Sequence, residues 1–286
     1  QHIAWGESNA IAFAKSVIGA RTNRYADLMD IWAAIVGKVP EFCLHLTKNR
    51  RARILIRITG VSETWLQKRA AYPLLGYIFG EMAGDRVAAI DGIPAVSLDC
   101  LKSFSAAASC SGAVGLFHVI GVTPEALSQE MCFKNTAPEE IHEITPLQIM
   151  ETLEKLSSNS GKSPDLIAAG CPHYSYPEFD YLAKRLNSRR IHDSMVFWVF
   201  TSRSVYNWIR DSGLLTDLKK SGVTVFTDGC PLQYPKSEWH FSAAMSDSAK
   251  YASYCFSQTG LDVTLGSIED CVETAVHGKL CRSLFT

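Results

Sequence analysis

The sequence predicts an α/β fold built around largely parallel sheets. In the second half of the chain, short apolar runs of strand length alternate with segments of helical periodicity, the pattern of strands joined by helical crossovers. In the first half, a short apolar run bounded by glycines predicts a buried strand. The composition, 47% hydrophobic and 20% charged over 286 residues, is that of a globular protein with one large core or two smaller ones.

The first half of the chain is predicted to mix helices and strands. A helix over 27–36 is expected to end at Gly37, and Thr145 stands where the N-cap of a helix over 146–156 belongs. The elements expected in this half are helices over 8–20, 27–36, 98–108 and 146–156, and strands over 53–59, 87–90 and 112–119.

The second half has a more regular rhythm. A polar, serine-rich stretch over 157–163 is the expected linker between two domains, 1–156 and 164–286, the second of which carries Cys171 and Cys230. The elements expected beyond the linker are strands over 165–169, 195–200, 223–226 and 263–265, and helices over 176–186, 202–211, 214–220 and 248–254.

Charge and cysteine content exclude several classes of protein. The net charge of −1, with acid and base mixed along the chain, gives no reason to expect binding to nucleic acid or membranes. Nine cysteines without a C-x-x-C pair indicate reduced thiols and a cytoplasmic protein. The sequence opens at Gln1 without a methionine, so we expect a fragment or a processed chain.

Two cysteines follow predicted strands in matching settings. Cys171 lies in Gly-Cys-Pro after the strand over 165–169, and Cys230 lies in Gly-Cys-Pro after the strand over 223–226. Ligands of parallel sheets bind beyond the carboxyl ends of the strands, and thiolates hold iron–sulfur clusters. We therefore expect Cys171 and Cys230 to lie close together as metal ligands. Two turn cysteines without a metal are the alternative.

A dense set of polar residues stands at the two ends of the first apolar helix. The planar guanidinium of Arg21 suits a carboxylate or a phosphate, and neighbouring hydroxyl and amide groups could complete the grip. The alternative is structural, with helix capping at one end and a turn at the other. The residues expected to bind substrate here are Ser8, Asn9, Arg21, Thr22 and Asn23.

Three residues are candidates for proton transfer or substrate contact during catalysis. Lys250 is expected near a helix start, which suits an anionic substrate; the alternative is a solvated lysine. His173 stands beside Cys171 and is either a donor to the substrate or a hydrogen-bonded turn histidine. Glu7 is either an acid/base group or a first-turn carboxylate favoured by the helix dipole.

Long motifs carry a resemblance to one family. Residues 5–24 (WGESNAIAFAKSVIGARTNR) resemble the aconitase X family, which shows an E-S-x-A stretch followed by V-x-G-A-R-T-N-R. The resemblance covers nearly the whole chain. It continues through 33–40 (AAIVGKVP), 46–50 (LTKNR), 111–126 (SGAVGLFHVIGVTPEA), 170–175 (GCPHYS), 201–203 (TSR), 227–230 (TDGC), 245–250 (MSDSAK) and 265–278 (LGSIEDCVETAVHG).

The resemblance implies an aconitase-like layered fold and a hydro-lyase with an iron–sulfur cluster. The substrate would be a small hydroxy acid, with cis-3-hydroxy-L-proline favoured over mevalonate 5-phosphate, and a small swivelling domain or subunit would be the partner. In the matching motif, Asp247 and Ser248 are expected to bind substrate beside Lys250. A zinc hydrolase is disfavoured because no ligand spacing supports it.

Three departures from the family pattern lead to a further expectation. The family's segment with C-T-C-T-P and its serine-bearing small domain have no counterpart here, and Asp247 stands where asparagine is common. A non-catalytic or degenerate subunit is therefore the alternative function. We expect the chain alone to lack a full active site and to expose an apolar seam near residue 1.

Overall fold

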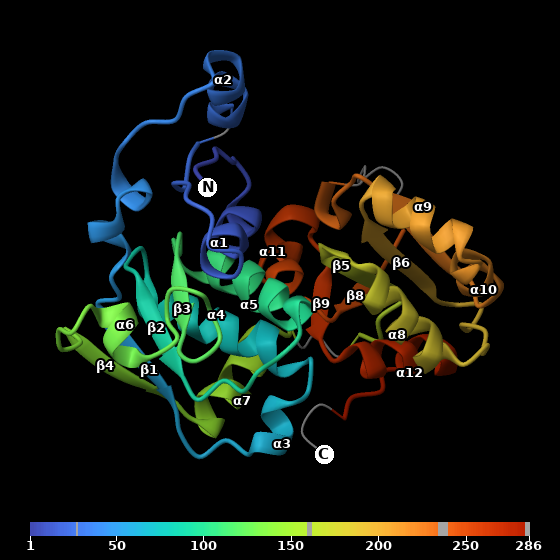
Figure 1. The fold of residues 1–286 in the computed structure, drawn as a ribbon. Helices are drawn as coiled ribbons and strands as arrows, with labels where there is room; N and C mark the ends of the chain where they lie inside the picture. The colour runs from blue at the N-terminus through green and yellow to red at the C-terminus, as the bar shows by residue number, and fades with distance from the viewer. Residues whose placement is uncertain (27, 159–161, 234–239, 284–286) are drawn as a thin grey trace. The chain divides into compact units, whose positions relative to one another are not determined.

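The computed structural model describes residues 1–26, 28–158, 162–233 and 240–283. The chain divides into two compact units, Gln1–Thr152 and Leu153–Thr286 (Figure 1). Each unit contains one sheet in which every pair of neighbouring strands is parallel, so the expected α/β fold with parallel sheets is confirmed. The expected linker over 157–163 lies partly outside the described residues. No helix in these ranges is both long and apolar enough to cross a membrane.

The first unit is built on a four-stranded sheet in the order β3-β2-β1-β4. β1 is central, and its Leu55 lies opposite Ala89 on one neighbour and Ile141 on the other. β4 was not predicted, because its sequence EIHEI is mostly exposed at the edge of the sheet. The strands are β1 (Ile54–Ile58), β2 (Ala88–Asp91), β3 (Phe117–Val119) and β4 (Glu140–Ile144).

Helices cover both faces of this sheet. Phe79, Phe104 and Phe117 stack between the helices and the sheet on one face, with ring centroids 5.1 to 6.2 Å apart. Cys132 and Phe133 pack on the other face. The helices are α1 (Ser8–Ser16), α2 (Met29–Val36), η1 (Cys43–His45), η2 (Thr47–Arg50), α3 (Glu63–Leu66), α4 (Ala71–Ala83), α5 (Leu98–Ser111), α6 (Gln129–Phe133) and α7 (Pro146–Lys155).

The close packing of α4 against α5 depends on two glycines. A Cβ on Gly76 would overlap the carbonyl oxygen of Phe104, and a Cβ on Gly80 would overlap that of Ala108. Their four-residue spacing puts both on one face of α4, so the two backbones approach without an intervening side chain. α4 was not predicted, because a helix that is apolar on nearly every side shows no periodic pattern.

Two helix ends test the sequence predictions directly. The hydroxyl of Thr145 accepts a hydrogen bond from the Gln148 amide at 3.4 Å, which confirms it as the cap of α7.

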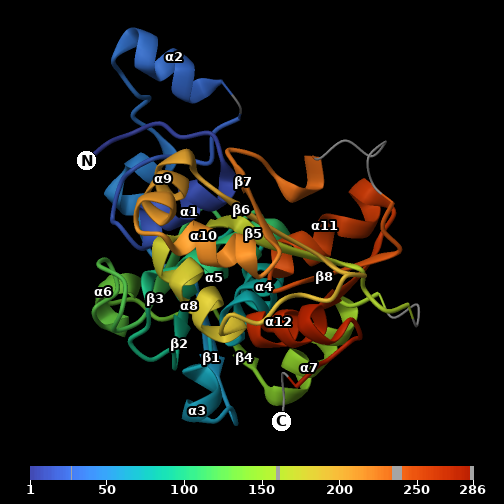
Figure 2. The ribbon, with the colours of Figure 1, turned by 90° about the vertical axis from the view of Figure 1, so that its right-hand side faces the viewer.

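α2 lies at the end of a long loop (Figures 1 and 2) and has no buried residue. It exposes Ile31, Trp32, Ile35 and Val36, the last two by 76% and 64%. An apolar surface is therefore exposed on α2, and the seam expected near residue 1 stays a prediction.

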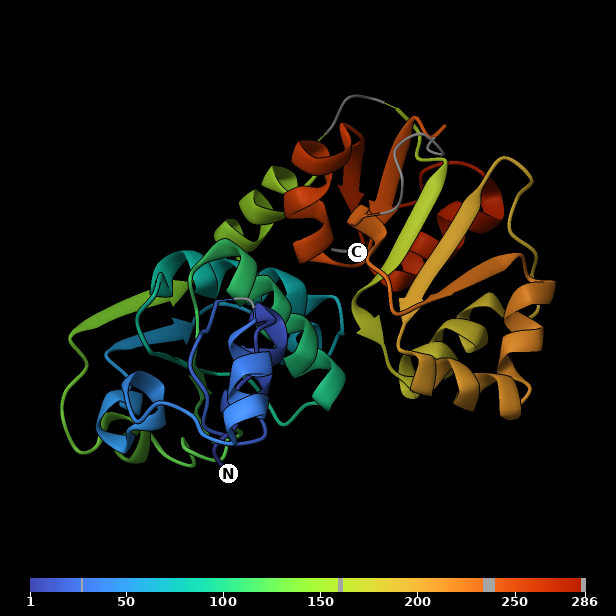
Figure 3. The ribbon, with the colours of Figure 1, turned by 90° about the horizontal axis from the view of Figure 1, so that it is seen from above.

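The second unit is built on a five-stranded sheet in the order β7-β6-β5-β8-β9. β5 is central and pairs with β6 through Ile167 and Phe197, and with β8 through Ile167 and Met245. Figure 3 shows these strands side by side with helices flanking them. The strands are β5 (Leu166–Tyr174), β6 (Val196–Thr201), β7 (Val223–Thr227), β8 (Ala243–Ser246) and β9 (Asp262–Leu265).

Serine caps begin most helices of this unit just beyond the strands. Ser175, Ser202, Ser248 and Ser267 each accept a backbone N–H of the first turn. β8 and the last helix were not predicted, although Ser267 and its capping partner three residues on were a usable signal. The helices are α8 (Tyr176–Leu186), α9 (Arg203–Asp211), α10 (Leu214–Lys220), η3 (Pro231–Gln233), α11 (Ala249–Thr259) and α12 (Ile268–His277).

β5 extends further than the sequence predicted. The expected strand ended at residue 169, whereas β5 continues to Tyr174 and contains Cys171. Its register against β6 shifts between Ala169 and Tyr174. Gly170 allows this, because its φ of +92° suits glycine and a Cβ there would overlap the Phe200 backbone. Cys171 therefore lies in an irregular end of the strand rather than in a turn beyond it.

Candidate functional site

The two Gly-Cys-Pro segments of the second unit lie side by side. His173, two residues after Cys171, donates from Nε2 to the carbonyl oxygen of Gly229 at 2.7 Å, and Gly229 directly precedes Cys230. The imidazole therefore ties the end of β5 to the segment after β7, although β6 lies between these strands in the sheet. This contact matches the hydrogen-bonded alternative for His173, although the residue lies near the end of β5 rather than in a turn.

Both thiols lie near one buried phenol. The Tyr251 side chain is fully buried, and its hydroxyl has no hydrogen-bond partner among the described residues. Burial raises the pKa of Tyr251, and the thiols of Cys255, Cys171 and Cys230 raise it further. Cys171 and Cys230, which come from different segments, therefore face the same region of the unit.

The start of α11 is joined to the Cys171 segment. The Ser248 hydroxyl accepts the Tyr251 amide at 3.1 Å and donates to the carbonyl oxygen of Cys171. The Ser248 side chain is buried, and its hydroxyl makes both of these hydrogen bonds within the protein. Lys250 lies in the first turn of the same helix and is partly exposed. The structure thus brings Ser248 and Lys250 to the place where Cys171 lies.

Asp247 is held by a tyrosine of β5. The Tyr174 hydroxyl donates to Oδ2 of Asp247, and burial followed by the charge of Asp247 raises the pKa of Tyr174 well above its usual value. Four of the predicted residues in this unit therefore lie in or beside the end of β5. They are Cys171, His173, Asp247 and Ser248.

The described residues contain no complete metal-binding donor set. Within them, no group of three or more histidine, cysteine, aspartate or glutamate side chains has an arrangement that could bind a metal ion. Cys255 and Cys271 are buried, and burial raises the pKa of both thiols, which marks them as core residues rather than ligands. A role of Cys171 and Cys230 as metal ligands stays a prediction.

In the first unit, the predicted residues before and in α1 make structural contacts. Glu7 is the N-cap, and its Oε2 accepts the Ala10 amide at 2.8 Å, so Glu7 and not Ser8 caps this helix. The carbonyl oxygen of Asn9 accepts the Ser105 hydroxyl at 3.1 Å. Ser8 begins α1, and its side chain lies outside what the structure describes.

The residues after α1 hold η1 in place. Arg21 donates from Nη1 to the carbonyl oxygen of His45 at 2.8 Å. Asn23 is buried, accepts the Leu44 amide at 2.7 Å and donates to the carbonyl oxygen of Phe42 at 3.3 Å. Thr22 is fully buried. These contacts match the structural alternative for Thr22 and Asn23, and a substrate role for them stays a prediction.

His45 and His118 make structural contacts. His45 Nε2 lies 2.6 Å from the Tyr25 hydroxyl and its Nδ1 lies 2.9 Å from Nδ1 of His2. His118 Nε2 donates to the carbonyl oxygen of Arg50 at 2.8 Å. Burial lowers the pKa of both His45 and His118, as expected for neutral imidazoles in a polar core.

Sequence reasoning missed two buried polar residues, Tyr251 and Lys15. Tyr251 follows Ser248 by three residues, and its backbone amide donates to the Ser248 hydroxyl that caps α11. Lys15 follows Ile11 by four residues and shares its buried face of α1. The available signal for Lys15 was a lysine at an apolar position of a helix.

Comparison with known proteins gives a consistent result. Profiles of the first, second and third domains of aconitase X match residues 1–48, 52–154 and 164–277. A cis-3-hydroxy-L-proline dehydratase from Pseudomonas aeruginosa is 37% identical, with 98% of this chain and 48% of that protein covered. A phosphomevalonate dehydratase large subunit from Methanosarcina mazei is 36% identical, with 97% and 65% covered.

A solved structure agrees with the sequence comparisons. The crystal structure of Thermococcus kodakaraensis aconitase X in its holo-form superposes with a TM-score of 0.86 at 28% identity. The superposition covers 96% of this chain and 68% of that one. In the sequence comparison, this chain spans about half the length of the Pseudomonas relative. Because the three domain profiles together match most of its residues, the chain belongs to the aconitase X family.

Proposed function

We propose that this chain is part of a hydro-lyase that removes water from a small hydroxy acid, with cis-3-hydroxy-L-proline as the substrate. The observation that carries the proposal is the hydrogen bond between His173 and Gly229, which brings the two cysteine segments together. The dehydratase names of the relatives at 37% and 36% identity support the same reaction type. Mevalonate 5-phosphate is the alternative substrate, because the second relative is named for it.

The proposed cofactor is an iron–sulfur cluster, with Cys171 and Cys230 as two of its ligands. Such clusters take three or four protein thiolates, so further ligands would come from outside the described residues. When bound, a cluster with an open iron position supplies a Lewis acid for the departing hydroxyl. The holo-form of the Thermococcus structure supports a cofactor in this family.

The chain's own residues would bind the substrate and move its protons. Arg21 offers a guanidinium for a carboxylate, and we assign it the anchor, with Ser8, Asn9, Thr22 and Asn23 around it. Lys250 would attract an anion at the start of α11, beside Asp247 and Ser248. His173, Lys250 and Glu7 are the candidates for proton transfer.

A small domain or subunit is the proposed partner. The Methanosarcina relative is named a large subunit, which implies a smaller companion for that protein. The exposed apolar face of α2, with Trp32 and Ile35 at its centre, is a surface that such a partner could cover. We also propose a reducing, cytoplasmic setting, because all nine cysteines are free thiols.

Anaerobic reconstitution with iron and sulfide tests the cluster. The chain completed by its partner domain should take up iron and gain visible absorption, and Cys171→Ser or Cys230→Ser should each abolish most of that absorption. Cys110→Ser, in the first unit, is the matched control and should leave it unchanged. Uptake that survives loss of both predicted ligands would exclude the site and favour a non-catalytic subunit.

The substrate is tested with the enzyme completed by its partner domain. Hydroxyproline and phosphomevalonate should be assayed in parallel for release of water. Arg21→Lys keeps the charge but not the planar fork, so it should weaken binding of the preferred substrate by roughly 10- to 100-fold. Normal binding by that variant would remove Arg21 as the anchor.

A further inference from the structure

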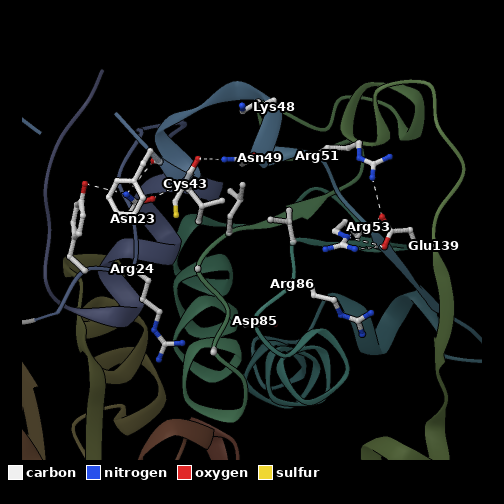
Figure 4. A pocket seen from close by; sticks show the side chains of 17 residues that line it. Asn23, Arg24, Cys43, Lys48, Asn49, Arg51, Arg53, Asp85, Arg86 and Glu139 are labelled. Atoms are coloured by element: carbon white, nitrogen blue, oxygen red, sulfur yellow. Dashed lines mark hydrogen bonds and ion pairs between the residues drawn. The ribbon is translucent and has the colours of Figure 1, made fainter. Parts of the chain in front are cut away.

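A pocket of about 720 Å³ opens at the amino-terminal edge of the first unit's sheet (Figure 4). Residues that directly precede all four strands line it: Arg53, Val87, Leu116 and Glu139. Its volume lies in the range of sites that bind small molecules.

The pocket is lined by an excess of positive charge. Five cations line it, against the two carboxylates of Asp85 and Glu139; the cations are Arg24, Lys48, Arg51, Arg53 and Arg86. Glu139 already pairs with Arg51 at 3.0 Å and Arg53 at 2.8 Å (Figure 4). Among the described residues, the side chains of Arg24 and Lys48 make no hydrogen bond or ion pair. The lining therefore carries uncompensated positive charge on two sides.

A buried amine stands behind the pocket wall. Lys15 of α1 is fully buried, and its Nζ has no hydrogen-bond partner among the described residues. A Cβ on Gly115 would lie 3.3 Å from Lys15 Nζ, 3.3 Å from Leu44 Cδ1 and 3.7 Å from Arg24 Cβ. Gly115, Leu44 and Arg24 all line the pocket. The amine therefore lies next to Gly115, a residue of the pocket lining.

The charges around Lys15 disfavour its ammonium form. Burial lowers the pKa of Lys15 to about 7, and the guanidinium groups of Arg50 and Arg24 contribute to the shift. Arg50 itself is neutralised by Glu125, whose two oxygens both lie 2.9 Å from its Nε. His45 in η1 faces the same cluster, and α5 and β3, which pack on α1, present Ser105 and the Phe117 amide. The amine thus changes charge near neutral pH.

We propose that this pocket binds a small molecule carrying a doubly charged oxyanion of the phosphate class, and that Lys15 takes up a proton when the anion binds. Arg24 and Lys48 supply the direct cationic contacts, since neither has a partner in the described structure. The anion lowers the cost of the buried ammonium, which in turn strengthens binding. A singly charged carboxylate should bind more weakly, because it interacts less with these cations and with the Lys15 ammonium.

Sulfate is the clean probe, because it stays fully ionised, so any proton taken up from the buffer on binding must go to the protein. We suggest isothermal titration calorimetry of sulfate into the 286-residue chain, between pH 7 and 8, in buffers of different ionisation enthalpy. Uptake of roughly half a proton per bound sulfate is expected, with affinity falling roughly tenfold between pH 6 and pH 9. Inorganic phosphate should bind similarly, and acetate more weakly.

Three variants separate the contributions. Lys15→Met keeps the apolar stem and should abolish both the proton uptake and the pH dependence. Arg24→Gln and Lys48→Gln change exposed side chains, so the fold is retained, and each should weaken sulfate roughly two- to fivefold with uptake preserved. Lys184→Gln, an exposed lysine of the second unit, should change nothing.

Several outcomes would overturn the proposal. They are failure of sulfate and phosphate to bind, equal affinity for acetate, or identical proton uptake in the parent and Lys15→Met. Because the readout is anion binding rather than catalysis, none of these outcomes bears on the proposed dehydration.

Discussion

The imidazole Nε2 of His173 lies 2.7 Å from the carbonyl oxygen of Gly229, and this one hydrogen bond joins the two segments that carry Cys171 and Cys230. The strands that lead to these segments are not neighbours, since β6 lies between them. His173 thus acts as a positioning residue for Cys230, whatever further part it takes in proton transfer.

Removal of this bond should loosen any metal that the two cysteines share. In His173→Ala, we expect the affinity for iron after reconstitution to fall roughly tenfold, because residues that orient ligands contribute on that scale. His173→Gln, which keeps an N–H donor, should recover part of the loss. Equal iron affinity in all three proteins would show that the segments hold their positions without the imidazole.

The two buried tyrosines of the second unit should respond in opposite directions to loss of the hydroxyl. Tyr251→Phe removes a buried group with no partner and should raise the free energy of unfolding by about 1 kcal/mol. Tyr174→Phe removes the donor to Asp247 and should lower it by about 1 to 3 kcal/mol. Urea denaturation measures both, and destabilisation by Tyr251→Phe would mean that its hydroxyl has a partner.

The ion pair between Arg50 and Glu125 should make the first unit sensitive to acid. Burial alone would raise the pKa of Glu125, but the Arg50 guanidinium outweighs it and holds the pKa below 4.5. A carboxyl whose pKa is lowered on folding stabilises the protein above its unfolded pKa. This stabilisation should therefore be complete above about pH 5 and be lost as the pH falls through the lowered value.

Glu125→Gln tests whether the ion pair stabilises the protein above pH 5. It leaves the Arg50 charge buried without a counterion, so the free energy of unfolding at pH 7 should fall by about 3 kcal/mol. In this variant, the free energy of unfolding should also fall less than in the parent protein as the pH drops below 5. Asp180→Asn, which breaks an exposed pair with Lys184, is the control and should cost less than about 1 kcal/mol. A comparable cost for both would mean that the Arg50 pair is effectively solvated.

The packing of α4 on α5 should tolerate no added methyl group. Gly76→Ala places a Cβ against the Phe104 carbonyl, so the helices must separate, at about 2 kcal/mol or more. Gly6→Ala, where the nearest atoms lie 3.7 Å away, is the matched control. Thermal unfolding compares the two, and similar melting temperatures would show that the helices can shift without loss.

The sequence was most informative where strands and turns follow a rhythm. The matching Gly-Cys-Pro settings predicted that Cys171 and Cys230 lie close, because parallel strands end at one edge of a sheet. The same reasoning placed Cys171 beyond its strand, whereas β5 continues irregularly through it. That irregularity depends on the contact of Gly170 with Phe200, which is distant in the sequence and invisible to a local pattern.

The sequence gives at most a weak signal for residues whose environment comes from tertiary packing. A single lysine in α1 looks like a solvated side chain until α5 and η2 bury it, and only the fold shows that Lys15 is enclosed. In the same way, Ser8 is the better cap by preference, yet the backbone at Glu7 is extended and its carboxylate reaches the Ala10 amide. Local propensity and the folded chain disagree at both positions.

The central place of β5 has a consequence for the order of folding during synthesis. β5, β6 and β7 can align as soon as residue 227 has emerged, but the other edge of β5 waits for β8, which begins at Ala243. Until then Leu166 and Ile167, which are fully buried in the finished unit, present unpaired backbone along one edge of β5. A nascent chain that pauses between Thr227 and Ala243 therefore offers an open sheet edge, and such edges recruit other unfinished strands.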